Sequence, residues 1–257
     1  MYLMYGDQAY DQEGRGQKFF LYGGMFIDHS KAGIVHSRIE ELRRKAGFGS
    51  EHGLKFASST RPSTVSLDAH TEIKRAVIAL AQEVGVTLCA YIFLQAIGHS
   101  RDQARLVEYG ANMVLGRYNE FLTEKDQHGV AELGRLNKNG FSYAREKFQH
   151  GLSFTNHDRP LDRVISFGLA CDGASHLSSM TDVLLGALQY CVNEPEKDTS
   201  TAMLPKLVPL MWSGTSEGKR DVRERGLNLR PKKVDSPNHQ GEYDKLLDRL
   251  QGCLDRL

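Results

Sequence analysis

Residues 2–7, Tyr-Leu-Met-Tyr-Gly-Asp, decide the fold of this chain. This apolar run ends at Asp7, and a second apolar run spans residues 19–27 after a polar loop that contains Gly14 and Gly16. Two such runs joined by a glycine-containing loop predict a pair of antiparallel strands. A rigid strand end fixes a carboxylate while the loop leaves it open, which favours a site for a hard divalent cation. The same acid also fits a simple turn former.

Beyond this pair, strand-like and helical patterns alternate along the chain. Apolar residues recur at helical spacing over residues 30–46, 68–84, 103–123, 142–150 and 177–192. Short apolar runs predict strands at residues 54–57, 86–94, 130–133 and 163–171. Antiparallel first strands followed by alternating elements indicate an α/β fold, in which helices cover both faces of a mixed sheet.

The last part of the chain is richer in basic residues than the rest. We therefore expect a main domain at residues 1–195, and a basic loop with a helical extension at residues 196–257 that packs on the main domain. The cations of the basic loop are Lys219, Arg220, Arg223, Arg225, Arg230, Lys232 and Lys233. They predict a mobile loop or extension that either contacts nucleic-acid phosphates or forms a solvated charged surface. A leucine stripe over residues 242–257 favours docking on the main domain or on a second copy in a homo-oligomer.

The overall composition excludes several classes of protein. At 257 residues and a formal charge of +1, the chain attracts nucleic acid only through local patches. Its four cysteines form no CxxC pair, so neither a zinc site nor a disulfide framework is indicated. The N-terminal apolar stretch is too short for a signal peptide, and charges interrupt each later run before membrane-spanning length. We therefore expect a cytoplasmic protein with no membrane partner.

The predicted helix at residues 177–192 carries an acid outside its apolar stripe. This acid is Asp182, which has Ser178 and Gly186 one turn on either side. Glycine costs about 1 kcal/mol relative to alanine in a helix interior, so Gly186 indicates close packing or room for a ligand. Asp182 fits either a solvent-facing acid favoured by the helix dipole or a site residue that meets the first strand.

A resemblance to a known family rests on five stretches in a fixed order. They are residues 4–11 (Met-Tyr-Gly-Asp-Gln-Ala-Tyr-Asp), 20–24 (Phe-Leu-Tyr-Gly-Gly), 54–56 (Leu-Lys-Phe), 146–152 (Glu-Lys-Phe-Gln-His-Gly-Leu) and 179–187 (Ser-Met-Thr-Asp-Val-Leu-Leu-Gly-Ala). The succession resembles the DUF3800 family over residues 1–195. That resemblance implies a ribonuclease H-like fold, acids gathered at the centre of the sheet, and metal-dependent nuclease activity.

The resemblance also implies roles for individual residues. Asp7 and Asp182 would bind Mg²⁺ or Mn²⁺, and Lys55 would contact a phosphate or the leaving oxygen. Two cations held by carboxylates can activate a water and stabilise the leaving oxygen of a phosphodiester in RNA or DNA. Magnesium usually keeps several waters, so acids from separate elements suffice. Lys55 also fits a charge that protects a strand edge from aggregation.

The chain departs from the family pattern at several positions. Gln8 stands where the family has Glu, and an amide neither carries charge nor acts as a base, which weakens this position of the predicted catalytic set. Gly53 and Gly134 stand where relatives carry acids. Glu132 would share a strand face with Gly134 and is the predicted substitute metal ligand. Asp172 is a further candidate, although its position in a turn fits a structural role.

Three functions are compatible with these residues. The first is a metal-dependent nuclease that acts on RNA or DNA. The second is a catalytically inactive binding protein of the same fold, which the departures from the family favour. The third is a metal-dependent phosphatase or nucleotidase that uses the same carboxylates on a small substrate, and only the basic C-terminal segment speaks against it.

Overall fold

The computed structural model describes residues 1–9, 17–98, 103–134, 140–154, 157–170, 174–216 and 218–256. Its centre is a six-stranded sheet in the order β10-β3-β2-β1-β4-β7. The bounds of these strands are β1 (Tyr2–Ala9), β2 (Phe19–Asp28), β3 (Thr87–Leu94), β4 (Gly129–Gly134), β7 (Val164–Ala170) and β10 (Leu227–Arg230). β1, β2 and β3 pair antiparallel, β1, β4 and β7 pair parallel, and β10 runs parallel to β3. The carboxyl ends of β1, β4 and β7 therefore meet at one edge.

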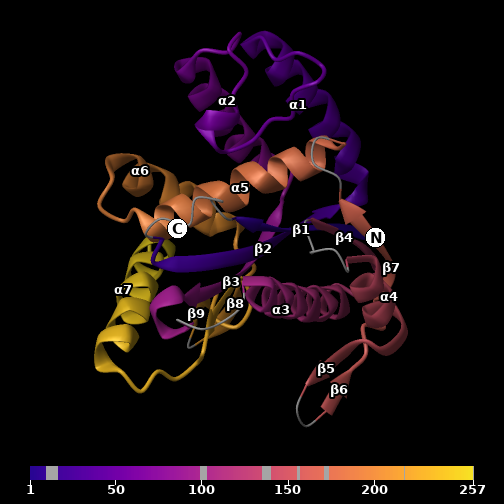
Figure 1. Cartoon of the computed structure of the whole chain (residues 1–257), viewed down its shortest axis with the longest axis vertical. Coiled ribbons are helices and arrows are strands. Elements are labelled where there is room, and N and C mark those ends of the chain that lie inside the picture. Colours follow the sequence, from indigo (N-terminus) through magenta and orange to yellow (C-terminus); the bar gives the residue numbers. More distant parts are fainter. Residues whose placement is uncertain are drawn as a thin grey trace.

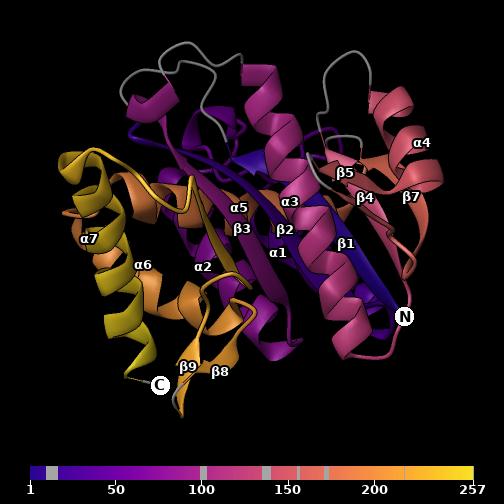
Figure 2. The ribbon, with the colours of Figure 1, turned by 90° about the horizontal axis from the view of Figure 1, so that it is seen from below.

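Helices cover both faces of this sheet (Figure 1). On one face, α5 (His176–Asn193) packs on β1 and β2, and α1 (Ala32–Ala46) and α2 (Leu67–Glu83) pack in turn against α5. On the other face lie α3 (Gln103–Glu124) and α4 (Gly140–His150), as Figure 2 shows for α3. The buried apolar residues form one cluster on each face. The predicted mixed sheet with antiparallel first strands and helices on both faces is confirmed.

Two adjacent glycines of β2 let both helical layers approach the sheet closely. A Cβ on Gly23 would lie 2.4 Å from Cδ2 of Leu185 in α5, and a Cβ on Gly24 would lie 2.6 Å from Cγ1 of Val114 in α3. Successive residues of a strand face opposite sides, so each glycine admits one helix. Gly23 is paired with Asp7 of β1, so the close approach brings α5 over the predicted site residue.

The predicted strand at residues 54–57 is wrong. These residues have no regular secondary structure and lead into the short 3-10 turn Ser58–Thr60. Phe56 packs directly on Gly186 of α5, so the segment has helices as neighbours and no strand to pair with. Its apolar composition reflects burial, since Leu54 is fully buried.

The C-terminal part contributes a strand to the main sheet, where the sequence predicted a loop or extension. β10 comes from this segment and pairs with β3. The remaining elements are the hairpins β5 (Leu152–Phe154) with β6 (His157–Arg159) and β8 (Gly214–Ser216) with β9 (Lys219–Asp221), and the helices α6 (Asp198–Leu207) and α7 (Pro237–Leu254). The division of the chain at residue 195 stays a prediction.

α7 docks on its own chain. Leu246, Leu250 and Leu254 of its predicted stripe are buried in the cluster that contains α5. The hydroxyl of Tyr243 accepts from the Leu94 amide at 2.9 Å and donates to the Arg230 carbonyl at 2.6 Å. Pairing of two copies through this helix stays a prediction. No helix in the described part of the chain is both long and apolar enough to span a membrane.

Candidate active site

A pocket lies at the sheet edge where β1, β4 and β7 end, and its atom-free space, which includes open solvent, is about 370 Å³. Ligand sites commonly lie beyond the carboxyl ends of strands in such sheets. Its lining residues are Tyr5, Gly6, Asp7, Leu54, Lys55, Gly134, Ala170, Ser178, Ser179, Thr181 and Asp182. Three residues of the predicted catalytic set, Asp7, Lys55 and Asp182, thus line one pocket although they lie far apart in the sequence.

Asp7 reaches the pocket from β1. The backbone amide of Gln8 donates to Asp7 Oδ1 at 2.8 Å, which restricts the carboxylate. On the neighbouring strand, Gly134 leaves room for it, because a Cβ there would lie 2.9 Å from Asp7 Oδ1. The glycine that stands where an acid was expected therefore makes space for the acid on β1.

Asp182 enters the pocket from α5. The Phe56 amide donates to Asp182 Oδ2 at 3.4 Å, so the irregular segment contacts the second acid directly. This approach depends on Gly186, one turn further along the helix, where a Cβ would lie 2.5 Å from Cβ of Phe56. Close packing, one of the two roles expected of this glycine, is confirmed by that contact.

The side chain of Gln8 points away from Asp7. In the regular pairing of β1 with β2, Gln8 lies opposite Tyr22, whose ring belongs to the cluster beneath α3. Side chains alternate along a strand, so Gln8 and Asp7 leave the sheet on opposite faces. Burial, with a smaller contribution from the Asp7 charge, raises the pKa of the Tyr22 hydroxyl far above its usual range. A catalytic role for Gln8 stays a prediction.

Glu132, the predicted substitute ligand, is not among the residues that line the pocket. It pairs with Tyr5 of β1 and lies over Gly168 of β7, where a Cβ would be 2.3 Å from Glu132 Oε1. Burial raises the pKa of the Glu132 carboxyl, which favours its protonated form and weakens it as a cation ligand. Asp172, the other candidate, falls outside the described residues.

The donor set fits one hard cation. Within the described ranges, no three His, Cys, Asp or Glu side chains are grouped so that they could hold a metal. Asp7 and Asp182 nevertheless supply two carboxylates from separate elements to one pocket. Magnesium is commonly bound by one or two carboxylates while it keeps several waters and contacts substrate phosphates. A single hydrated cation therefore suits these residues better than a pair of cations.

Several pocket residues were missed in the sequence, among them Tyr5 and Ser179. Tyr5 lies two positions before Asp7 and so shares its strand face, which the period of a strand could have indicated. Burial raises the pKa of the Tyr5 hydroxyl, an effect that a hydrogen bond with Ser175 opposes in part, so Tyr5 is a neutral group. Ser179 lies three positions before Asp182 on α5, and helical spacing could have indicated it.

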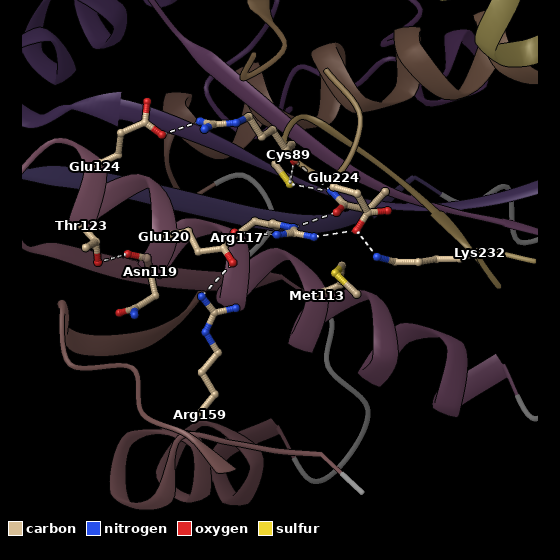
Figure 3. Close-up of polar contacts among 12 residues, drawn as sticks. Cys89, Met113, Arg117, Asn119, Glu120, Thr123, Glu124, Arg159, Glu224 and Lys232 are labelled. Atoms are coloured by element: carbon tan, nitrogen blue, oxygen red, sulfur yellow. Dashed lines mark hydrogen bonds and ion pairs between the residues drawn. The ribbon is translucent and has the colours of Figure 1, made fainter. Parts of the chain in front are cut away.

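The basic C-terminal segment is distant from this pocket in the sheet. β3 and β2 lie between β10 and β1. Several of its cations form ion pairs within the chain, some of which Figure 3 shows. Arg225 pairs with Glu124, while Arg230 and Lys232 pair with Glu224 at 2.8 Å and 3.0 Å. This charge run therefore supports the internal structure of the chain.

Comparisons with known proteins give distant similarity in structure alone. The chain is similar to Bst-RNase HIII in complex with Mn²⁺, with 9% sequence identity and a TM-score of 0.46. It is also similar to a mutant protein of Bst-RNase HIII, with 12% identity and a TM-score of 0.37. Each match covers 85% of this chain and 63% of the ribonuclease chain. No model of a known protein family matches the chain, and no curated protein matches it.

Proposed function

We propose that this chain is a metal-dependent nuclease of the DUF3800 type that hydrolyses phosphodiester bonds in RNA or DNA. One observation carries the proposal: Asp7 and Asp182, from separate elements, line one pocket together with Lys55. Carboxylates bind a hard cation, and a lysine binds a phosphate oxygen. The pocket opens at the carboxyl edge of parallel strands, where a substrate can enter.

Each residue has a separate task in this proposal. Asp7, restricted by the Gln8 amide, and Asp182, contacted by the Phe56 amide, hold Mg²⁺ or Mn²⁺ through their carboxylate oxygens. When bound, the cation supplies Lewis acidity and lowers the pKa of a coordinated water. Lys55 binds a phosphate oxygen or the leaving oxygen and orients the scissile bond over the carboxylates.

A metal-dependent phosphatase or nucleotidase is the second candidate. The basic C-terminal segment was the only feature against it, and cations of that segment are engaged by acids of the same chain. A small phosphate ester needs only the pocket itself. The third candidate, an inactive binding protein, is favoured by the lack of a third metal-binding acid in the described part of the chain.

The decisive experiment compares substrates as well as variants. Labelled RNA, labelled single- and double-stranded DNA, and nucleoside monophosphates are incubated with the protein and Mn²⁺ or Mg²⁺. We expect cleavage of a nucleic acid that is lost in Asp7→Asn and Asp182→Asn and kept in Asp248→Asn, which changes an exposed acid of α7. Release of phosphate from monophosphates alone would favour the phosphatase.

Gln8→Glu separates a weakened enzyme from an inactive binding protein. We expect this variant to cleave modestly faster than the parent. Residue 8 leaves the sheet on the face opposite Asp7, so its added charge acts on the cation only over a longer distance. If neither protein cleaves any substrate with either cation, the binding protein becomes the better description.

A cytoplasmic location is part of the same proposal, supported by the free thiols of Cys89, Cys191 and Cys253, all of them buried.

A further inference from the structure

The irregular segment at residues 54–56 supplies two groups to the pocket without regular secondary structure to hold it. Lys55 lines the pocket, and the Phe56 amide donates to Asp182. Irregular segments lack the ladder of hydrogen bonds that fixes a strand, so their backbone groups need partners from elsewhere. These partners come from α2, the helix whose sequence carried no predicted role.

His70 of α2 contacts the backbone of Lys55. Its Nε2 lies 3.0 Å from the Lys55 carbonyl oxygen, and the residue is only 1% exposed. A carbonyl oxygen can only accept, so Nε2 carries the proton of this ring. Its Nδ1 has no partner among the described residues, and burial lowers the pKa of the ring. The neutral ring therefore makes a single directed contact.

Lys74, one turn further along α2, contacts the next residue of the segment. Its ammonium donates to the Phe56 carbonyl at 3.2 Å and to Ser58 Oγ at 3.4 Å, and it lies 4.7 Å from the centre of the Phe56 ring. No carboxylate of the described residues lies within ion-pair distance of it. Burial lowers the pKa of Lys74, as expected for a lysine committed to backbone and ring acceptors.

The contacts of His70 and Asp182 fall on the same peptide unit. The carbonyl of Lys55 and the amide of Phe56 belong to one planar group, so their directions are fixed relative to each other. The carbonyl accepts from His70 at 3.0 Å on the α2 side, and the amide donates to Asp182 at 3.4 Å on the α5 side. A hydrogen bond to the carbonyl also polarises the amide and strengthens it as a donor.

We propose that His70 and Lys74 are positioning residues of the active site, which hold the Lys55–Phe56 peptide so that its amide orients the Asp182 carboxylate and Lys55 faces the pocket. This inference rests on the proposed function for its catalytic consequence. Neither residue touches the pocket directly. Partners of metal-binding groups often matter nearly as much as the ligands, and their loss typically costs about 10- to 100-fold in metal affinity or activity.

The test uses paired variants at each position. His70→Phe keeps an aromatic ring but removes the donor, whereas His70→Gln offers an amide N–H near the position of Nε2. Lys74→Met keeps the apolar stem against Phe56, and Lys74→Arg keeps a charged donor. Each variant is examined by hydrogen exchange of the peptide that covers residues 54–58, by calorimetric titration with Mn²⁺, and by kcat and KM on the cleaved nucleic acid.

We expect faster exchange at residues 54–58 in His70→Phe and Lys74→Met, with the rest of the exchange pattern unchanged. Mn²⁺ affinity and kcat should fall about tenfold or more, and the conservative variants should recover most of the loss. Global destabilisation would raise exchange everywhere, so it is distinguishable from local release. If His70→Phe does not fold, Lys74→Met carries the same test.

The inference is overturned if the folded donor-lacking variants keep the exchange protection of the parent at residues 54–58. It is also overturned if exchange rises there while Mn²⁺ affinity is unchanged. Failure of the proposed function looks different, because the parent would then neither bind Mn²⁺ nor cleave nucleic acid. In that case exchange at residues 54–58 alone decides whether His70 and Lys74 position the peptide.

Discussion

Phe56 lies against Gly186 so closely that a side chain on the glycine has no room. A Cβ at Gly186 would lie 2.5 Å from Cβ and 2.7 Å from Cγ of Phe56. The contact brings the irregular segment onto α5, one turn after Asp182, and allows the Phe56 amide to reach that carboxylate. The geometry of the pocket thus depends on a glycine in the middle of a helix.

Replacement of Gly186 by alanine should reduce metal binding and cleavage more than it reduces stability. Alanine gains about 1 kcal/mol of helix propensity, whereas forced overlap in a packed region costs about 1–3 kcal/mol. We expect a net loss of stability of about 1 kcal/mol in urea unfolding, and a fall in Mn²⁺ affinity or cleavage of about tenfold or more, because Phe56 must shift away from Asp182.

Gly241→Ala is the matched control for that change, because a Cβ at Gly241 of α7 meets nothing within 4 Å. It should stabilise the protein by up to about 1 kcal/mol and leave Mn²⁺ binding unchanged. Equal effects of the two alanines on Mn²⁺ binding would contradict the importance of the Phe56 contact.

Arg117 of α3 should prove important for the attachment of the C-terminal part (Figure 3). It donates to Asn228 of β10 at 2.8 Å, to Glu120 at 2.6 Å and to Glu224 at 2.8 Å. Arg117→Met should cost about 2 kcal/mol in urea unfolding, since half-buried charged acceptors lose their donor. Arg75→Met removes an exposed pair with Glu72 and should cost less than about 0.5 kcal/mol. Similar losses in both variants would argue against this network.

Low pH should lower the free energy of unfolding, in part because Glu224 becomes protonated. Burial alone would raise the pKa of this carboxyl, but hydrogen bonds from Arg230 and Lys232 lower it from 4.5 to about 2. A carboxyl whose pKa falls on folding stabilises the protein above pH 4.5, and this stabilisation is lost as the pH falls toward about 2. Glu224→Gln should remove that part of the pH dependence.

The measurement is urea unfolding of both proteins at about pH 6 and about pH 3. At the higher pH the free energy of unfolding of the parent should exceed that of Glu224→Gln by about 1 kcal/mol. The difference is modest because the Glu224 side chain is 40% exposed and screened by solvent. The gap should narrow at the lower pH. A gap that stays constant would show that this carboxyl does not titrate in the folded protein as described.

Salt dependence of binding should identify the cations that contact nucleic acid. In an Asp7→Asn background that prevents cleavage, Lys55→Gln should reduce the slope of log affinity against log salt by about 1. Arg225→Gln should leave that slope unchanged, because Arg225 already pairs with Glu124. Fluorescence anisotropy with a labelled oligonucleotide measures both, and the reverse ranking would restore the C-terminal segment as the binding surface.

Local sequence patterns were sufficient for the first strands and the long helices, because their burial follows the period of the element. β10 was not predicted, since residues 227–230 are few, two of them are polar, and their partner β3 lies far away in the sequence. The apolar run at residues 54–57 indicates burial, but so short a run does not distinguish a strand from an irregular segment that is buried against a helix.

The candidate site was predictable in part from the order of the motifs that carry the family resemblance. The order of motifs indicated Asp7, Lys55 and Asp182, which line one pocket. Glu132 pairs with Tyr5, whereas the pocket opens two residues further along β4, at Gly134. His70 and Lys74 could not have been chosen from α2, because their partners are backbone carbonyls of another segment.

Calorimetric titration of Mn²⁺ into the parent, Asp7→Asn and Asp182→Asn tests most directly whether these two acids share a cation. The amide variants keep the shape of the side chains and remove their charge. We predict one binding event in the parent that weakens by at least about tenfold in each variant. Identical binding in all three proteins would contradict a metal centre between β1 and α5.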